Sequence, residues 1–308
     1  MNATRARVIA TVLVCLFIAG TAGLWSQVRI VSLSPTPTEI VYTLGAGDQV
    51  VGVTSFCIFP SRVQQDVREG RVRIVSDFNH TDMALIDSLK PGLILTDTDF
   101  QRKITEELRR KGYKVLHYVP KTLEDVFRSI EEIGEAIGKG DSAKQLTDGY
   151  RKEIREIVAR TSKLPKVRVY MEINHIGPWA SGSVSPLNDI INDAGGENIF
   201  GDTATGVFMT SNAEIVRRNP DVILSPIWLS AKLGGYDGIT PLAEIYGRPG
   251  FDKTGAVMKS RVLYYDSALL KHEGPRQVLA IRKLAHILHP NDFEDPPGTI
   301  PWELGWIR

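Results

Sequence analysis

The residues of this chain that are suited to chemistry stand in short groups, and most groups come directly after an apolar run. Aromatic rings dominate them, mixed with hydroxyl, amide, carboxyl and imidazole groups. Stacked rings bind a large planar ligand, and polar side chains hold its rim. The alternative is that about half of these aromatics only close the edges of a sheet, and we favour Phe56, Phe78 and Trp179 as ligand contacts. The predicted binding set is Ser34, Thr36, Phe56, Cys57, Phe59, Phe78, Asn79, His80, Asp97, Phe100, Asn174, His175, Trp179, Phe208, Met209, Trp228 and Asp266.

Three of these side chains could also ligate a metal. His80 and His175 fall at predicted strand ends in opposite halves of the chain, so a metal-centred ligand could meet one from each side. Loop histidines without a ligand role are the alternative that we favour. For Cys57, a reactive thiolate competes with a small buried residue, and we favour the buried residue. The sequence therefore predicts no metal site and no cofactor of the protein's own.

Catalytic motifs are missing from the sequence. No Gly-x-Gly-x-x-Gly follows a predicted strand, and neither a phosphate loop nor a Gly-x-Ser-x-Gly elbow occurs. The 37 basic and 36 acidic residues are interspersed, without the basic stripe that nucleic-acid binding requires. These absences count against an enzyme and against a nucleic-acid partner.

The N-terminus resembles a secretory leader. Two arginines precede an almost wholly apolar run from residue 8 to 19, and Gly20-Thr21-Ala22 offers a cleavage site. We assign residues 1–22 to a signal peptide, with an uncleaved membrane anchor as the alternative. Cys15 follows the bulky Val14 and so does not match the pattern for lipid attachment. The chain is therefore predicted to be exported, to the periplasm or to the outer face of the cytoplasmic membrane.

The elements that position the candidate residues alternate between short apolar strands and amphipathic helices. Such alternation predicts an α/β fold with mainly parallel sheets. A long helical pattern separates two such halves, so we predict two α/β lobes joined by one rigid helix. The predicted divisions are 28–140 for the N-terminal lobe, 141–163 for the connecting helix, 165–290 for the C-terminal lobe and 291–308 for a C-terminal extension.

The segment from Arg29 to Gly45 is the most informative local pattern. It reads as a buried strand that enters a helix through Ser34-Pro35-Thr36-Pro37. We interpret Thr36 and Glu39 as a capping box, with Pro37 at the first helical position and Gly45 as the C-terminal stop.

Five stretches, in order and covering most of the chain, resemble the class III periplasmic binding proteins of ABC importers, which serve cobalamin and ferric siderophores. The second, with its aromatic, cysteine and aromatic-proline pattern, is most similar to the cobalamin-binding branch. The stretches are residues 29–45, 51–60 (VGVTSFCIFP), 86–95 (IDSLKPGLIL), 193–200 (DAGGENIF) and 261–276, which runs from RVLYYD to GPR.

The resemblance implies two Rossmann-like lobes joined by one long rigid helix. It also implies a monomer that captures a metal chelate in the cleft between the lobes and delivers it to an inner-membrane permease. The chelate would be cobalamin, another corrinoid, a ferric siderophore or haem. Parallel sheets independently place ligands beyond the carboxyl ends of their strands. The resemblance also implies one permease-docking glutamate on each lobe, where this chain has Ala84 and Ala213. We therefore predict docking through the neighbouring acids Asp82 and Glu214. A non-transport surface protein that binds or senses the ligand remains the alternative, and an enzyme using the cleft is a weaker one.

Overall fold

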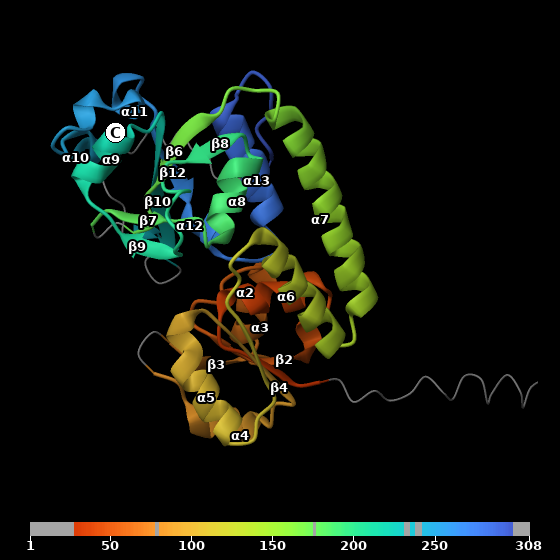
Figure 1. The fold of residues 1–308 in the computed structure, drawn as a ribbon. Coiled ribbons are helices and arrows are strands. Elements are labelled where there is room, and N and C mark those ends of the chain that lie inside the picture. The colour runs from red at the N-terminus through yellow and green to blue at the C-terminus, as the bar shows by residue number, and fades with distance from the viewer. Residues whose placement is uncertain (1–27, 78–79, 175–176, 231–234, 238–241, 298–308) are drawn as a thin grey trace, which may run out of the picture.

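The computed structural model describes residues 28–77, 80–174, 177–230, 235–237 and 242–297. Two sheets divide these residues into two lobes, one below the other in Figure 1. This confirms the predicted fold class. Within the described residues, no helix combines the length and the apolar character that crossing a membrane requires.

The sheet of the first lobe is wholly parallel, in the order β3-β2-β1-β4-β5. Ile30 and Val31 point to opposite faces of the sheet. Ile30 joins the core under α2 and α6, and Val31 joins the core under α4 and α5. The elements are β1 (Ile30–Ser32), α2 (Pro35–Thr43), β2 (Val50–Thr54), α3 (Ser61–Arg68), β3 (Arg73–Ser76), α4 (Met83–Leu89), β4 (Leu93–Asp97), α5 (Arg102–Arg110), β5 (Val115–Tyr118) and α6 (Leu123–Ala136), with 3-10 turns at Gly47–Gln49 and Asp99–Gln101.

The second lobe is built around the long strand β10, which pairs in parallel with β6 and β12 and antiparallel with β11. A separate antiparallel pair joins β7 to β9. The elements are β6 (Val167–Met171), β7 (Trp179–Ser181), α8 (Pro186–Asp193), β8 (Gly196–Asn198), β9 (Val207–Met209), α9 (Asn212–Arg218), β10 (Val222–Ser230), β11 (Gly235–Asp237), α10 (Leu242–Tyr246), α11 (Gly255–Met258), β12 (Val262–Asp266), α12 (Ser267–Lys271) and α13 (Gln277–Leu288), with a 3-10 turn at Phe251–Lys253.

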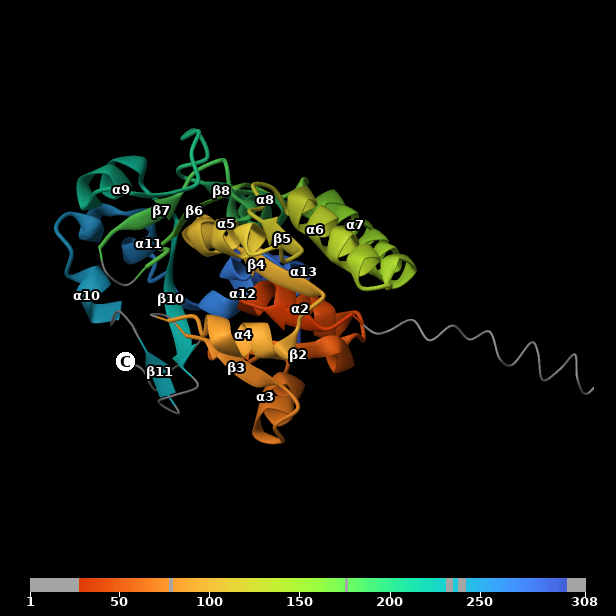
Figure 2. The ribbon, with the colours of Figure 1, turned by 90° about the horizontal axis from the view of Figure 1, so that it is seen from below.

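The connecting helix α7 (Gly140–Thr161) runs along one side of both lobes (Figure 1) and lies beside α6 (Figure 2). One continuous cluster of buried apolar side chains extends from Ile40 in α2 through Ile130 in α6 to Leu284 in α13. The lobes therefore share a core, and a large change in their relative position would expose apolar surface that is now buried.

The start of α2 differs from the prediction. The N-cap residue is Ser34, Pro35 occupies the first turn, and no side chain caps the helix. The predicted capping box is therefore wrong, because Glu39 turns away from the helix start and pairs with an arginine of the second lobe. The predicted C-terminal stop is confirmed: the helix ends at Thr43, and Gly45 adopts the left-handed φ of 71°.

Candidate functional site

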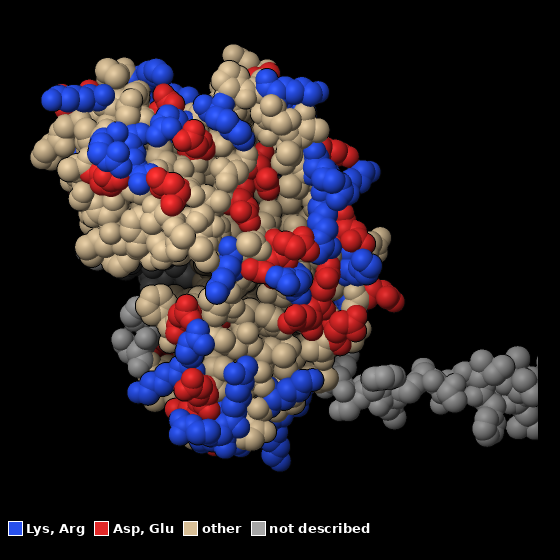
Figure 3. Space-filling view, viewed as in Figure 1, with Lys and Arg blue, Asp and Glu red and all other residues tan. Residues whose placement is uncertain are grey.

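The surface is hollowed between the two lobes, on the side opposite α7 (Figure 3). The predicted residues of the first lobe follow the carboxyl ends of β1, β2, β3 and β4, because parallel strands end at one edge of their sheet. The second lobe contributes the β7–β9 pair and the end of β12. We take this hollow as the candidate ligand cleft.

Aromatic side chains of the first lobe remain uncovered at these strand ends. Phe56 is 47 %, Phe59 43 % and Phe100 99 % exposed. Each of the three rings therefore keeps exposed apolar surface that a ligand could cover.

Cys57 lies between the two phenylalanines but faces inward. Its thiol is 4 % exposed and lies 3.2 Å from the hydroxyl oxygens of both Thr38 and Thr54. Burial raises the pKa of the thiol, which keeps it protonated. The buried position fits the packing role that the sequence favoured, so we withdraw Cys57 as a ligand contact.

Ser34, Thr36 and Asp97 form a hydrogen-bonded group beside the start of α2. Both hydroxyls donate to the Asp97 carboxylate, while burial dominates and raises the pKa of Asp97 to about 6. A cavity of about 10 Å³ separates this group from Glu273 of the second lobe, and Tyr118 also lines it. Burial, reinforced by the charge of Asp97, raises the pKa of Glu273 to about 8.

In the second lobe, Trp179 and Met209 are direct cross-strand neighbours, so their side chains share one face of the β7–β9 pair. Met209 is exposed and Trp179 is partly buried. Phe208 lies on the other face, where its ring packs edge-on against Phe200 with centroids 5.5 Å apart. Phe208 therefore supports the wall of the cleft from behind.

The remaining predicted residues lie in several different parts of the structure. The Asp266 carboxylate accepts from the backbone N–H groups of Ala268 and Leu269 and so caps α12. Asn174 is partly buried just beyond β6, and His80 is exposed beyond β3. Phe78, Asn79 and His175 lie outside the described residues, as does the side chain of Trp228. Among the described residues, no three His, Cys, Asp or Glu side chains gather to hold a metal.

The two predicted docking acids lie at the starts of two helices that each carry an exposed alanine, Asp82 as the N-cap of α4 and Glu214 in the first turn of α9. Asp82 caps α4 by accepting from the backbone N–H of Leu85 at 2.9 Å. Glu214 in α9 pairs with Arg217 and Arg218, and these hydrogen bonds lower the pKa of Glu214 to about 2. Docking through either residue stays a prediction.

An interlobe contact was missed by the sequence reasoning. Nε of Arg276 donates to both carboxylate oxygens of Glu39, at 2.9 and 3.0 Å, and the guanidinium carbon lies 4.0 Å from the centroid of the Phe59 ring. The only sequence signal was the position of Arg276 in the last of the five family-like stretches.

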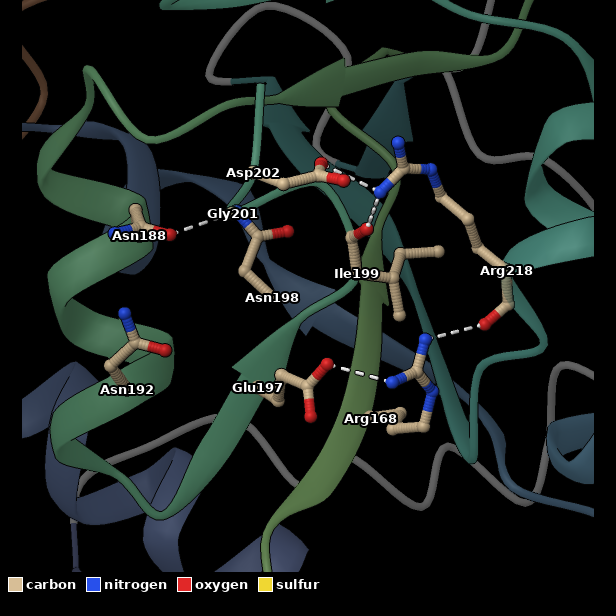
Figure 4. Close-up of a pocket in the computed structure, with 9 residues that line it drawn as sticks. All are labelled: Arg168, Asn188, Asn192, Glu197, Asn198, Ile199, Gly201, Asp202 and Arg218. Atoms are coloured by element: carbon tan, nitrogen blue, oxygen red, sulfur yellow. Dashed lines mark hydrogen bonds and ion pairs between the residues drawn. The ribbon is translucent and has the colours of Figure 1, made fainter. Parts of the chain in front are cut away.

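A separate polar cavity of about 350 Å³ lies on the second lobe, between α8, β8 and the end of α9 (Figure 4). Its two arginines are already paired, Arg168 with Glu197 and Arg218 with Asp202. It contains none of the predicted binding residues.

Two α/β lobes on one long helix, with an aromatic-walled cleft between them, define a solute-binding protein. The comparisons agree with this class. A family model described as periplasmic binding protein matches residues 30–269, and this chain belongs to that family.

Three proteins illustrate the similarity. An ABC transporter substrate-binding lipoprotein of Bacillus subtilis, YvrC, described as uncharacterized, is 30 % identical over 275 residues, which cover 87 % of this chain and 82 % of the relative. The vitamin B12-binding protein of Vibrio parahaemolyticus is 24 % identical over 198 residues, or 64 % of this chain and 70 % of the relative. The periplasmic heme-binding protein RhuT of Roseiflexus superposes with a TM-score of 0.71 at 22 % identity, over 86 % of this chain and 98 % of the other. The predictions of an exported binding protein, rather than an enzyme, are confirmed by this membership.

Proposed function

We propose that the protein captures a flat metal chelate in the interlobe cleft and delivers it to an ABC importer, and that the chelate is cobalamin or another corrinoid. The observation that carries this proposal is the set of exposed rings at the strand ends, Phe56, Phe59 and Phe100. Stacking on a planar macrocycle would remove this apolar surface from water.

The carboxyl groups beside the cleft favour a corrinoid over haem. Asp97, Asp266 and Glu273 place carboxyl groups near the strand ends, and the Arg276 guanidinium is already neutralised by Glu39. A corrin carries amide side chains, which can donate hydrogen bonds to the carboxyl oxygens whether or not these groups are ionised, whereas haem presents two carboxylates that need cations. The relatives named as vitamin B12-binding proteins support the same choice.

A ligand panel tests the proposal. The protein without residues 1–27 is titrated with cyanocobalamin, hemin and a ferric siderophore, with absorption and thermal unfolding as readouts. We expect cyanocobalamin to raise the unfolding temperature most, because a ligand that binds only the folded state stabilises it. A larger shift with hemin or with the siderophore would move the assignment to that chelate. No shift with any probe would refute a chelate-binding cleft.

Delivery to a permease is the second half of the proposal, and we keep Asp82 and Glu214 as its docking acids. The side chain of Arg217 is 67 % exposed, so its pair with Glu214 is a surface ion pair of small net energy that a partner arginine can replace. In a reconstituted importer, Asp82→Asn with Glu214→Gln should leave the chelate Kd unchanged and abolish ligand-dependent ATPase stimulation. Glu106→Gln, on the surface of α5, is the matched control. Unchanged stimulation would refute these docking acids, and chelate binding without any ATPase stimulation by the unmodified protein would favour the non-transport alternative.

A further inference from the structure

The start of α13 brings the second lobe into direct contact with the first. Gly274 packs so closely on α2 that an added Cβ would lie 3.3 Å from Cγ2 of Thr36. Arg276 follows two residues later, at the N-cap of α13. This backbone contact therefore fixes the position of the Arg276 Cα relative to the first lobe.

Arg276 reaches a buried carboxylate from this point. The Glu39 side chain is 3 % exposed and that of Arg276 is 19 % exposed, so the pair is shielded from solvent. Burial raises the pKa of Glu39, and the hydrogen bond and charge of Arg276 act against this rise. A buried carboxylate without a cation is costly, so the Glu39 carboxylate favours the paired position of the Arg276 guanidinium.

The same guanidinium covers one face of Phe59. At 4.0 Å from the ring centroid it lies at cation–π distance, while 43 % of Phe59 remains exposed. The ring thus has one face backed by an ion-paired arginine of the opposite lobe and surface left for a ligand. Arg276 therefore contacts both Glu39, in the ion pair between the lobes, and Phe59, in the wall of the cleft.

We infer that Arg276 is a positioning residue of the ligand site, which holds the Phe59 ring in its stacking orientation through the interlobe pair with Glu39. This inference rests on the proposed binding of a flat chelate. It follows that ligand affinity depends on the interlobe ion pair as well as on the aromatic rings. By thermodynamic linkage, a ligand stacked on Phe59 also strengthens the contact between the lobes.

A double-mutant cycle with cyanocobalamin and hemin as probes tests the inference. Arg276→Lys keeps a cation for Glu39 but loses the planar guanidinium. We expect it to weaken binding of whichever probe binds by about tenfold in the unmodified background, and by less than twofold in Phe59→Leu. Equal weakening in both backgrounds would overturn the inference, because Arg276 would then act on the site without Phe59. Arg282→Lys is the matched control, since Arg282 lies on the same helix and pairs with Glu153 at the surface.

A ligand-free arm separates failure of this inference from failure of the proposed function. 4-Fluorophenylalanine at position 59 reports the ring environment by fluorine NMR. We expect its resonance to shift in Arg276→Lys and to stay unchanged in Arg282→Lys. An unshifted resonance in Arg276→Lys would overturn the inference even where the chelate binds. If neither probe binds, the proposed function fails, and the resonance still decides whether Arg276 positions the ring.

Discussion

Replacing Arg248 by alanine should be among the most damaging single changes in the second lobe. Arg248 hydrogen-bonds both oxygens of the Glu172 carboxylate, where β6 ends at the cleft. The Glu172 side chain is wholly buried, and that of Arg248 is 9 % exposed. The Tyr265 hydroxyl also donates to the backbone carbonyl of Glu172, so the pair belongs to a buried polar group that orients the strand end.

The magnitude follows from the burial of the carboxylate. Removing one partner of a buried ion pair costs about 3 to 5 kcal/mol, because the remaining charge stays in the interior without compensation. For a chain of this size, that corresponds to a fall in Tm of roughly 6 to 15 °C. Arg217→Ala is the control, because its pair with Glu214 lies at the surface and its loss should lower stability far less.

The assay is urea unfolding followed by far-ultraviolet circular dichroism, with a second variant to identify the mechanism. Glu172→Gln in the Arg248→Ala background removes the uncompensated charge, and we expect it to restore at least a third of the lost free energy of unfolding. A loss below about 1 kcal/mol for Arg248→Ala would contradict the calculation. So would a double variant less stable than the single one.

Three further predictions use other residues of the cleft. The pKa of Asp97 is raised to about 6, so its stabilising contribution is complete below about pH 4 and is lost as pH rises toward 6. Between pH 4 and pH 7, the free energy of unfolding of Asp97→Asn should therefore rise relative to the unmodified protein by about 2 to 3 kcal/mol, and parallel curves in urea titrations at both pH values would contradict this. Phe100→Ala should change stability by less than about 0.5 kcal/mol, because the ring is almost fully exposed, yet weaken chelate binding several-fold in an absorption titration. An unchanged Kd would remove Phe100 from the site. Cys57 should resist a thiol reagent in the folded protein and react fully in urea, since its thiol is buried, and rapid labelling of the native protein would refute that placement.

Local patterns predicted most of the scaffold. The helices Met83–Leu89 and Asn212–Arg218 can be predicted from local sequence alone, because each combines apolar spacing with a capping residue and a following proline junction. Strand β8 was missed, because Gly196-Glu197-Asn198 has no apolar alternation and forms a strand only through its pairing with β6.

The sequence could predict which strand ends carry the candidate site, but it could not predict the contact between the two lobes. Strand ends in parallel sheets gather at one edge, so the exposed rings of Phe56 and Phe59 could be located from the sequence alone. The same reasoning cannot see a contact between Glu39 and Arg276, which lie 237 residues apart on different lobes. Glu39 was interpreted as a capping residue for that reason, since a local rule was the only one available to explain it.

The central claim is that the interlobe cleft holds a flat metal chelate. Its most direct test is the absorption spectrum, together with native mass spectrometry, of the protein purified from the organism that makes it. We predict a chromophore with a corrinoid spectrum and a mass increase equal to one chelate per chain, lost when Phe56 and Phe59 are both replaced by alanine. A colourless protein of unmodified mass that also takes up no cobalamin, haem or ferric siderophore would contradict the account.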